Sequence, residues 1–250
     1  METIIKVNNL TVILGGRKIL DDISFDVQRG EIFVILGGSG CGKSTLLKHM
    51  IGLMKPASGT ILIEGDDIVP AEDELRLKIL RKFGVMYQMG ALFGSMNLIE
   101  NVSLPLREFT SLNEEAIELV AHMKLKLVGL ENFSKHMPSE ISGGMKKRAA
   151  IARAMALDPK ILFLDEPSAG LDPITSAELD NLIISLSRNL GITFVVVTHE
   201  LPSIYKIADR VIMLDKRIRK IIATGHPETL RDTHEDAWVR QFFNREVSNN

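Results

Sequence analysis

The chain has 250 residues, of which 45% are apolar, and its 30 basic and 32 acidic residues nearly cancel. This length suits one sizeable domain, or a core with an inserted lobe, that buries a substantial apolar interior. A net charge of −2 argues against the broad basic surface that nucleic-acid binders carry, so no nucleic-acid partner is expected. The single cysteine, Cys41, excludes an internal disulfide and fits a reducing compartment.

No segment has the length and hydropathy of a membrane span. The longest apolar stretches, at 161–164 and 194–197, have the size of strands, whereas a spanning helix needs about 20 apolar residues. Residues 1–9 lack a basic patch followed by an apolar run, so no signal peptide is expected. We therefore expect a chain that does not cross a membrane by itself.

In the first ninety residues, strand patterns alternate with helix patterns. A helix is expected from Leu46 until Pro56 stops it, and a charged helix at 72–82. Strands are expected at 7–14 and 19–27 around the turn Gly15-Gly16-Arg17, and then at 31–36, 60–64 and 84–87.

The rest of the chain combines a helical stretch with further strands. Residues 97–136 are helical in pattern, with Asn113 as a helix start. Strands are expected at 161–164, 192–197, 210–214 and 220–223, and helices at 174–189 and 236–244. The expected fold is an α/β core formed by 1–90 and 158–250, with an antiparallel β portion and an α-helical lobe inserted at 91–157.

A glycine-rich loop lies between the strand at 31–36 and the helix after it. The pattern Gly37-x4-Gly42-Lys43-Ser44 in this context is typical of a phosphate loop, whose backbone N–H groups point at phosphate oxygens. Lys43 would reach the β- and γ-phosphates and the Ser44 hydroxyl would bind Mg2+. The residues expected to hold the nucleotide are Gly37, Gly38, Ser39, Gly40, Cys41, Gly42, Lys43, Ser44 and Thr45.

Polar side chains follow three of the predicted core strands. Asp165 and Glu166 end the strand at 161–164, where the first would hold Mg2+ and the second would act as general base on the attacking water. His199 follows the strand at 192–197 and could hydrogen-bond the γ-phosphate or that water. Gln88 follows 84–87 and could contact both Mg2+ and the γ-phosphate. Taken alone, His199 would be a histidine at a helix start with a satisfied ring, and Gln88 would be a polar loop residue. The phosphate loop favours the catalytic interpretation of both.

Ser142, Gly143 and Gly144 precede a helix and form a second anion-binding concavity. One nucleotide cannot use two such concavities of a single compact fold, so we expect a two-fold dimer that sandwiches two ATP molecules. The alternative is an ordinary capped helix. The following run 146–148 is either a solvated face or pairs with carboxylates of the phosphate site.

These motifs, in this order, resemble the ATP-binding subunit of ABC transporters over nearly the whole chain. The resemblance identifies Walker A as 37–45, the Q-loop glutamine as Gln88, the signature as 141–145, and Walker B as 161–165 followed by Glu166. It also identifies a D-loop at 168–172 and the switch histidine as His199. ATP and Mg2+ are the implied ligands, and an ATP-bound homodimer is the implied assembly.

A more specific resemblance rests on Gln88-Met89-Gly90-Ala91-Leu92-Phe93 together with 105–108, 138–145 and 239–242. These segments are similar to the ATPase of Mla-type phospholipid transport systems. The resemblance implies lipid cargo and a place on the cytoplasmic side of the inner membrane. Implied partners are a multi-pass permease, an MCE-type lipid-binding protein and small accessory subunits. The apolar residues at 91–93 and 98–99 are either core or part of a groove for a permease helix.

Two departures from the family pattern stand out. Leu14 replaces the aromatic residue that usually stacks on adenine, so adenine selectivity should be weaker, and Met145 replaces the common glutamine. Cys41 lies beside Lys43 and a helix N-terminus, conditions that lower a thiol pKa, so we expect alkylation to block ATP binding.

Two other functions remain open at this point. A non-transport ABC ATPase could act as a mechanical clamp in cell division, cluster assembly or DNA repair. The absence of long coiled-coil inserts, a second ATPase domain and a basic stripe argues against it. A phosphate-loop kinase would leave 142–144 unexplained.

Overall fold

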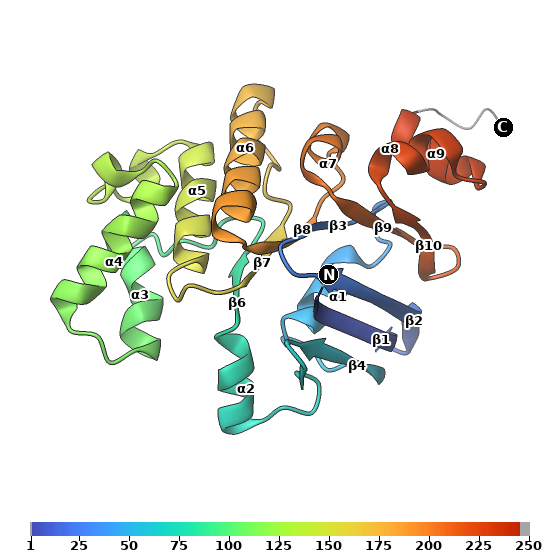
Figure 1. The fold of residues 1–250 in the computed structure, drawn as a ribbon, viewed down its shortest axis with the longest axis horizontal. Helices are drawn as coiled ribbons and strands as arrows, with labels where there is room; N and C mark the ends of the chain where they lie inside the picture. The colour runs from blue at the N-terminus through green and yellow to red at the C-terminus, as the bar shows by residue number, and fades with distance from the viewer. Residues whose placement is uncertain (1, 246–250) are drawn as a thin grey trace.

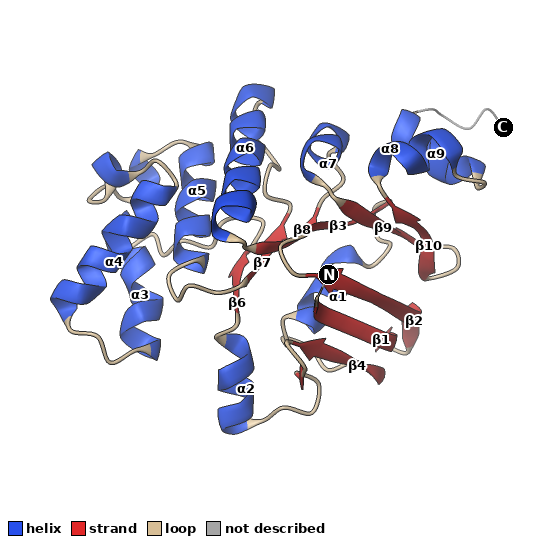
Figure 2. Ribbon diagram, viewed as in Figure 1, coloured by secondary structure: helices blue, strands red, loops and turns tan. Residues whose placement is uncertain are grey.

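The computed structural model describes residues 2–245, and residues 1 and 246–250 lie outside the described part. The described residues form two β-sheets with helices around them (Figures 1 and 2). In chain order the elements are β1 (Thr3–Leu14), β2 (Arg17–Gln28), β3 (Ile32–Gly37), α1 (Lys43–Met50), β4 (Ser58–Ile63), β5 (Asp66–Asp67), α2 (Asp73–Leu80), β6 (Phe83–Met86), α3 (Leu98–Phe109), α4 (Glu114–Leu127), η1 (Glu131–Phe133), η2 (Pro138–Glu140), α5 (Gly143–Ala154), β7 (Ile161–Asp165), α6 (Pro173–Leu190), β8 (Thr193–Val197), α7 (Leu201–Ile207), β9 (Arg210–Asp215), β10 (Lys220–Gly225), α8 (Pro227–Thr233) and α9 (Ala237–Asn244).

The larger sheet has the strand order β10-β9-β3-β8-β7-β6. Its strands are parallel except β10, which runs antiparallel to β9. The carboxyl ends of β3, β7 and β8 therefore lie at one edge, which is where open α/β sheets bind ligands. The register pairs Asp165 with Val197, so the residues that follow these two strands start from adjacent positions.

The central strand β3 is buried on both faces, as expected for a parallel strand between layers. Val34 and Leu36 belong to the core beneath the helices α5, α6 and α7, whereas Phe33 and Ile35 belong to the core around α1. Each such side chain contributes about 1.5–3 kcal/mol of burial free energy. The strand that leads into the phosphate loop is thus fixed from both sides.

The second sheet is antiparallel, with the order β2-β1-β4-β5. Helix α1 lies between the two sheets (Figure 1). Its Leu46, Leu47 and Met50 are buried in the same core as residues of β1 and β3. The predicted antiparallel β portion is therefore present, and it covers the face of the core sheet that carries α1.

Helices α3, α4 and α5 contact one another and gather beside β6, away from the antiparallel sheet (Figure 1). Asn97 and Asn113 begin α3 and α4, because their side chains accept hydrogen bonds from the backbone N–H of Glu100 and Ala116. The helix start predicted at Asn113 is confirmed. The lobe boundaries at 91 and 157 stay a prediction.

The expected strands and helices of the core are found, with ends displaced by a few residues. Two short helices, α7 and α8, had no counterpart among the expected elements. Both carry proline in the first turn, Pro202 and Pro227, where a missing N–H costs nothing. None of the helices within residues 2–245 is both long and apolar enough to span a bilayer.

Candidate nucleotide-binding and hydrolysis site

The phosphate loop, residues 37–45, is held in shape at two glycines that lie very close to residues of neighbouring strands. Gly37 has φ of 145°, and a Cβ there would lie 2.4 Å from the carbonyl oxygen of Leu214 in β9. Gly42 has φ of 103°, and a Cβ there would lie 2.8 Å from Cδ2 of Leu20 in β2. Only glycine fits both positions, so the loop is fixed between the two sheets.

The Lys43 side chain turns back over this loop. Its Nζ donates to the carbonyl oxygen of Gly37 at 2.9 Å and lies 3.4 Å from that of Gly38. Helix α1 begins at Lys43, so the positive end of the helix and the ammonium group face the same concavity. Ser44 is exposed and Thr45 half-buried in the first turn of this helix. The loop can therefore hold an anion such as a phosphate group.

Cys41 differs from the sequence-based expectation. Its side chain is only 3% exposed, and burial raises the pKa of its thiol although Lys43 acts in the opposite direction. The expectation of a lowered pKa was wrong, because desolvation of the thiolate outweighs the neighbouring positive charge. The sulfur lies 2.7 Å from the place that a Cβ of Gly37 would take, so the thiol packs against the loop backbone and is almost inaccessible to solvent.

Three buried side-chain oxygens lack a hydrogen-bond partner within the described residues, and all belong to the segment 165–168. They are Oδ1 of Asp165, Oε2 of Glu166 and Oγ of Ser168. Buried polar atoms without partners are rare, and a bound ion, water or ligand usually explains them. This segment therefore has the unpaired acceptors that a metal ion and an attacking water need.

Asp165 fits a magnesium ligand in position and in charge. Burial raises the pKa of its carboxyl, the charge of Glu166 raises it further, and Lys48, Lys43 and Lys147 oppose the shift. The described residues contain no cluster of three or more His, Cys, Asp or Glu side chains that could hold a metal alone. Mg2+ usually takes only one or two protein ligands beside phosphate and water. Asp165 with Ser44 fits that mode of binding.

Glu166 and His199 form one unit. Nδ1 of His199 lies 2.8 Å from Oε1 of Glu166, while Nε2 lies 3.5 Å from Oε1 of Glu200. Glu166 has φ of 47°, a left-handed conformation that its N–H bond to the carbonyl of Val197 maintains at 2.8 Å. One carboxylate oxygen of Glu166 is thus fixed by the histidine, and the other is available to a water molecule.

Gln88 is exposed, and its backbone is attached to this unit through Lys147 of α5. The buried Lys147 ammonium donates to the carbonyl oxygen of Gln88 and lies 3.4 Å from that of Glu166. Of the two interpretations of 146–148, a solvated face does not hold for Lys147, which interacts with Asp165 and Glu166. The second alternative, pairing with carboxylates of the phosphate site, therefore describes Lys147, but its hydrogen bond to the carbonyl oxygen of Gln88 was not predicted.

The signature turn, residues 141–145, is built as the start of helix α5. Ser142 is the N-cap of α5, and its Oγ accepts from the N–H of Met145 at 3.3 Å. Gly144 packs so closely on α6 that a Cβ would lie 2.3 Å from Cγ2 of Thr175. Helix α5 contacts α3, α4, α6 and β6, whereas α1 contacts β3, β7 and β8. The structure thus brings Asp165, Glu166 and His199 together and attaches the backbone of Gln88 to them through Lys147, while Gly144 in the first turn of the same helix packs against α6.

Comparison with known proteins gives a consistent result. A family model described as "ABC transporter" matches residues 20–169. The MlaF ATP-binding protein of the Escherichia coli K12 intermembrane phospholipid transport system is 46% identical over 92% of this chain and 84% of its own length. A probable ribonucleotide transport ATP-binding protein, mkl, of Mycobacterium leprae is 43% identical over 98% of this chain. The chain spans 70% of that relative, and 66% of the homologous protein of Mycobacterium tuberculosis H37Rv.

Solved structures agree with this result. The Clostridium perfringens protein cbiO1, part of the cbiONQ transporter complex, has a TM-score of 0.85 and 31% identity, with 98% of this chain and 97% of that chain covered. The dimeric ATP-binding cassette MJ0796, bound to ADP and Pi, has a TM-score of 0.79 and 32% identity, with 89% of this chain and 98% of that chain covered.

Proposed function

The chain belongs to the ABC transporter family, and from this premise we propose that it is the ATP-hydrolysing subunit of a phospholipid transport system. The observation that carries the catalytic part is the pair Glu166–His199 at 2.8 Å beside the unpaired acceptor of Asp165. The family match agrees with the predicted ATP-binding cassette. The roles of individual residues below are proposals.

In the proposed reaction, Lys43 and the backbone N–H groups of the phosphate loop bind the β- and γ-phosphates. Mg2+, held by Ser44 and Asp165, would neutralise phosphate charge when bound. Oε2 of Glu166 accepts a proton from the attacking water, whose oxygen bonds to the γ-phosphorus as the bond to the ADP oxygen breaks. His199 holds Oε1 of the same carboxylate, and the Gln88 side chain would contact the metal and the γ-phosphate when they are bound.

The second half of the site is proposed to come from another copy of the chain. The turn 142–144 is a helix start of the kind that binds anions, and it begins α5, whereas the phosphate loop leads into α1. A two-fold dimer would place the Ser142 turn of each copy on the nucleotide of the other. The dimeric cassette bound to ADP and Pi supports such an assembly. Hydrolysis would remove the γ-phosphate contacts and let the dimer open.

Lipid cargo is proposed from similarity, because the ATPase site itself contains nothing that binds a lipid. The MlaF relative is named for phospholipid transport and matches over more of its own length than the mkl relatives, which are named for ribonucleotide transport. The clamp function, without a membrane partner, remains the second candidate. We favour the transporter because the surface carries an apolar groove that suits a helix of a permease.

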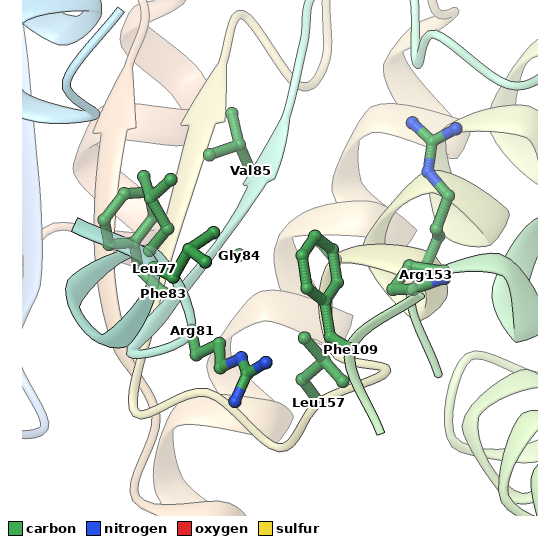
Figure 3. A pocket seen from close by; sticks show the side chains of 11 residues that line it. Leu77, Arg81, Phe83, Gly84, Val85, Phe109, Arg153 and Leu157 are labelled. Atoms are coloured by element: carbon green, nitrogen blue, oxygen red, sulfur yellow. The ribbon is translucent and has the colours of Figure 1, made fainter. Parts of the chain in front are cut away.

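A groove of ≈ 210 Å3 lies where α2, β6, α3 and α5 meet. Phe109, Leu157 and Val85 provide apolar walls, and the guanidinium of Arg81 lies 5.8 Å from the Phe109 ring centre (Figure 3). Such a surface suits a short amphipathic helix that presents apolar side chains and a carboxylate. We propose that a cytoplasmic helix of the partner permease binds here.

None of the residues 91–93 and 98–99 lines this groove, so the groove alternative for them stays a prediction. Leu98 is fully buried in the core, whereas Phe93 is 49% exposed. Arg153, which lines the groove, donates to the carbonyls of Gly90 and Ala91 at 3.0 and 2.7 Å. The loop after Gln88 is therefore attached to the proposed docking groove, a direct route from a bound permease helix to the hydrolysis site.

The remaining proposals concern location and assembly. The chain would sit as a peripheral subunit on the cytoplasmic side of the inner membrane, attached through the permease. An MCE-type lipid-binding protein and small accessory subunits would complete the system. Similarity to MlaF supports this assembly.

The test is to purify the tagged chain from gently solubilised membranes and identify what accompanies it. A multi-pass permease with an MCE-type protein and bound phospholipid would support the proposal. Recovery from the soluble fraction with only soluble partners would instead favour the clamp. As a control, Phe109→Glu with Leu157→Glu should release the permease and leave nucleotide binding unchanged.

A further inference from the structure

A buried carboxylate, Asp215, lies beside the phosphate loop, and the proposed mechanism has not used it. Asp215 ends β9 and lines a cavity of ≈ 50 Å3 together with Gly38 and Cys41 of the loop. Burial is the main cause of the raised pKa of the Cys41 thiol, and the charge of Asp215 adds to that shift. The residue before it, Leu214, is the one whose carbonyl oxygen Gly37 approaches. A negative charge is thus built into the wall of the loop that is proposed to bind phosphates.

Arg217, in the β9–β10 turn, pairs with this carboxylate. Its backbone N–H donates to Oδ1 of Asp215 at 2.7 Å, and its Nε donates to Oδ1 and Oδ2 at 3.1 and 2.8 Å. Nη2 makes a further hydrogen bond to Oδ2. The side-chain hydrogen bond from Arg217 holds the pKa of Asp215 below its ordinary value, so the carboxylate is ionised at neutral pH. Because a buried charge is weakly screened, Arg217 determines how much negative potential reaches the loop.

Helix α9 holds the guanidinium of Arg217, whose side chain is 57% exposed. Cζ of Arg217 lies 5.7 Å from a ring centre of Trp238, within the range of a cation–π contact. Trp238 also lines the cavity that contains Gly38, and it stacks on Phe242 of the same helix with 5.6 Å between ring centres. The C-terminal helix therefore stabilises the position in which Arg217 covers Asp215.

We propose that Arg217, positioned by Trp238, sets the affinity for nucleotide by cancelling the charge of Asp215 beside the phosphate loop. This inference rests on the proposed nucleotide site, because the charge acts on the phosphates that residues 37–45 bind. With the guanidinium in place, Lys43 and the loop N–H groups attract the phosphates without an opposing charge. When the guanidinium leaves, Asp215 repels them. The position of α9 is thereby coupled to ATP binding rather than to the hydrolysis step.

The test measures the binding of Mg-ATP and of inorganic triphosphate by titration calorimetry on the full chain, together with kcat and KM. Arg217→Gln should weaken the binding of both ligands about tenfold and raise KM to a similar extent, with kcat nearly unchanged, because the uncompensated charge acts on the phosphates. Trp238→Leu removes the aromatic ring and should weaken binding about twofold to fivefold. Trp238→Phe keeps a ring and should bind nearly as the wild type does.

The double variant Asp215→Asn with Arg217→Gln separates charge from structure. It lacks both the ion pair and the cation–π contact but leaves no charge behind, so binding should return to within about twofold of the wild type. Arg231→Gln is the matched control, because Arg231 of α8 also pairs with a carboxylate, that of Asp232, and its Cζ lies 5.5 Å from the ring centre of Tyr205. This control should change affinity by no more than about twofold.

Trp238 is the only tryptophan of the chain, so a large red shift of its fluorescence would show that an Arg217 variant releases α9. In that case Asp215→Asn alone decides, since it removes the carboxylate charge with Arg217 present and should bind ATP at least as tightly as the wild type; weaker binding would overturn the inference. Wild-type affinity in Arg217→Gln would also overturn it and leave the ATPase proposal intact.

A double variant that binds as weakly as Arg217→Gln would show that the ion pair is a structural contact only, which is a third result against the inference. A wild-type chain that binds neither ATP nor inorganic triphosphate would instead remove the proposed function itself.

Discussion

The Lys147 ammonium of α5 lies 3.4 Å from the backbone carbonyl oxygen of Glu166, the residue proposed as general base. The same ammonium donates to the carbonyl of Gln88. Burial lowers the pKa of Lys147, and the charges of Asp165 and Glu166 act against that shift. One side chain therefore connects the helix that follows the signature turn with both loops of the proposed hydrolysis site.

We expect Lys147→Met to bind ATP but to hydrolyse it about tenfold more slowly, because the loops that carry Glu166 and Gln88 lose a shared contact. A rise of about 1.4 kcal/mol in the activation free energy corresponds to that factor. Steady-state ATPase rates and ATP affinities measure the two effects separately. Lys146→Met removes the neighbouring, half-buried charge and serves as control. Equal turnover of the two variants would show that the connection has no role in hydrolysis.

Glu166→Gln should bind ATP and lose hydrolysis by a factor of about 10²–10⁴, the usual contribution of a general base. With γ-phosphate retained, the ATP-bound dimer should persist, which sedimentation in the presence of Mg-ATP would show. Glu200→Gln changes the other carboxylate near His199, 3.5 Å from its Nε2, and should retain most of the activity. Undiminished turnover in Glu166→Gln would remove this residue from the mechanism.

The sequence predicted the core of the site because its residues follow strands whose ends meet at one sheet edge. Asp165, Glu166 and His199 needed only the parallel register of β7 and β8 to come together. The features of the site that the sequence did not reveal depend on burial and on contacts between residues far apart in the chain. The raised pKa of Cys41 follows from desolvation. The approach of Lys147 to Gln88 crosses 59 residues, which no local pattern encodes.

Asp165 should make the nucleotide-free protein less stable as pH rises. Burial, and then the charge of Glu166, hold the pKa of its carboxyl above the ordinary value in the folded state, so the native state binds more protons. The corresponding stability is present below that value and is lost as pH rises through the folded pKa. Asp165→Asn should therefore raise the melting temperature by about 2–4 °C per kcal/mol regained, and more at about pH 8 than at about pH 5.

Thermal melts in EDTA measure this change in melting temperature. The dependence of ATP affinity on Mg2+ tests separately whether Asp165 binds the metal, because burial alone would not affect it. Asp180→Asn is the matched control, because burial also raises the pKa of Asp180, whose Oδ2 accepts from Ser203 at 3.1 Å. Only Asp165→Asn should lose the gain in ATP affinity that Mg2+ provides. A normal Mg2+ effect in Asp165→Asn would argue against Asp165 as the metal ligand.

Cys41 should react slowly with iodoacetamide in the native protein, because it is 3% exposed and burial raises its thiol pKa. The rate should rise by orders of magnitude in denaturant, where the thiol has an ordinary pKa. Mass spectrometry over a time course measures both rates. Cys41→Ser, which keeps the small side chain, should bind ATP normally. Rapid labelling of the native chain would restore the original expectation of a reactive thiol.

The signature turn is held on α6 by a close contact between Gly144 and Thr175. A Cβ at Gly144 would lie 2.3 Å from Cγ2 of Thr175, so Gly144→Ala should displace the start of α5. Overpacking of this kind costs about 1–3 kcal/mol, which denaturant unfolding would measure. Thr175 Oγ1 donates to Oδ2 of Asp172 at 2.6 Å, and Thr175→Ser keeps that hydrogen bond while removing the methyl group.

The double variant Gly144→Ala with Thr175→Ser should therefore regain most of the lost stability, whereas Thr175→Ser alone should cost little. Recovery would show that the methyl contact, and not a special backbone conformation, requires glycine at 144. The double variant would also separate the effect of Gly144→Ala on folding stability from its effect on ATP-dependent dimerisation. If the turn binds the γ-phosphate of a partner copy, the double variant should still show weakened ATP-dependent dimerisation, because the added Cβ lies within that turn. Full recovery of both stability and dimerisation would place Gly144 in packing only.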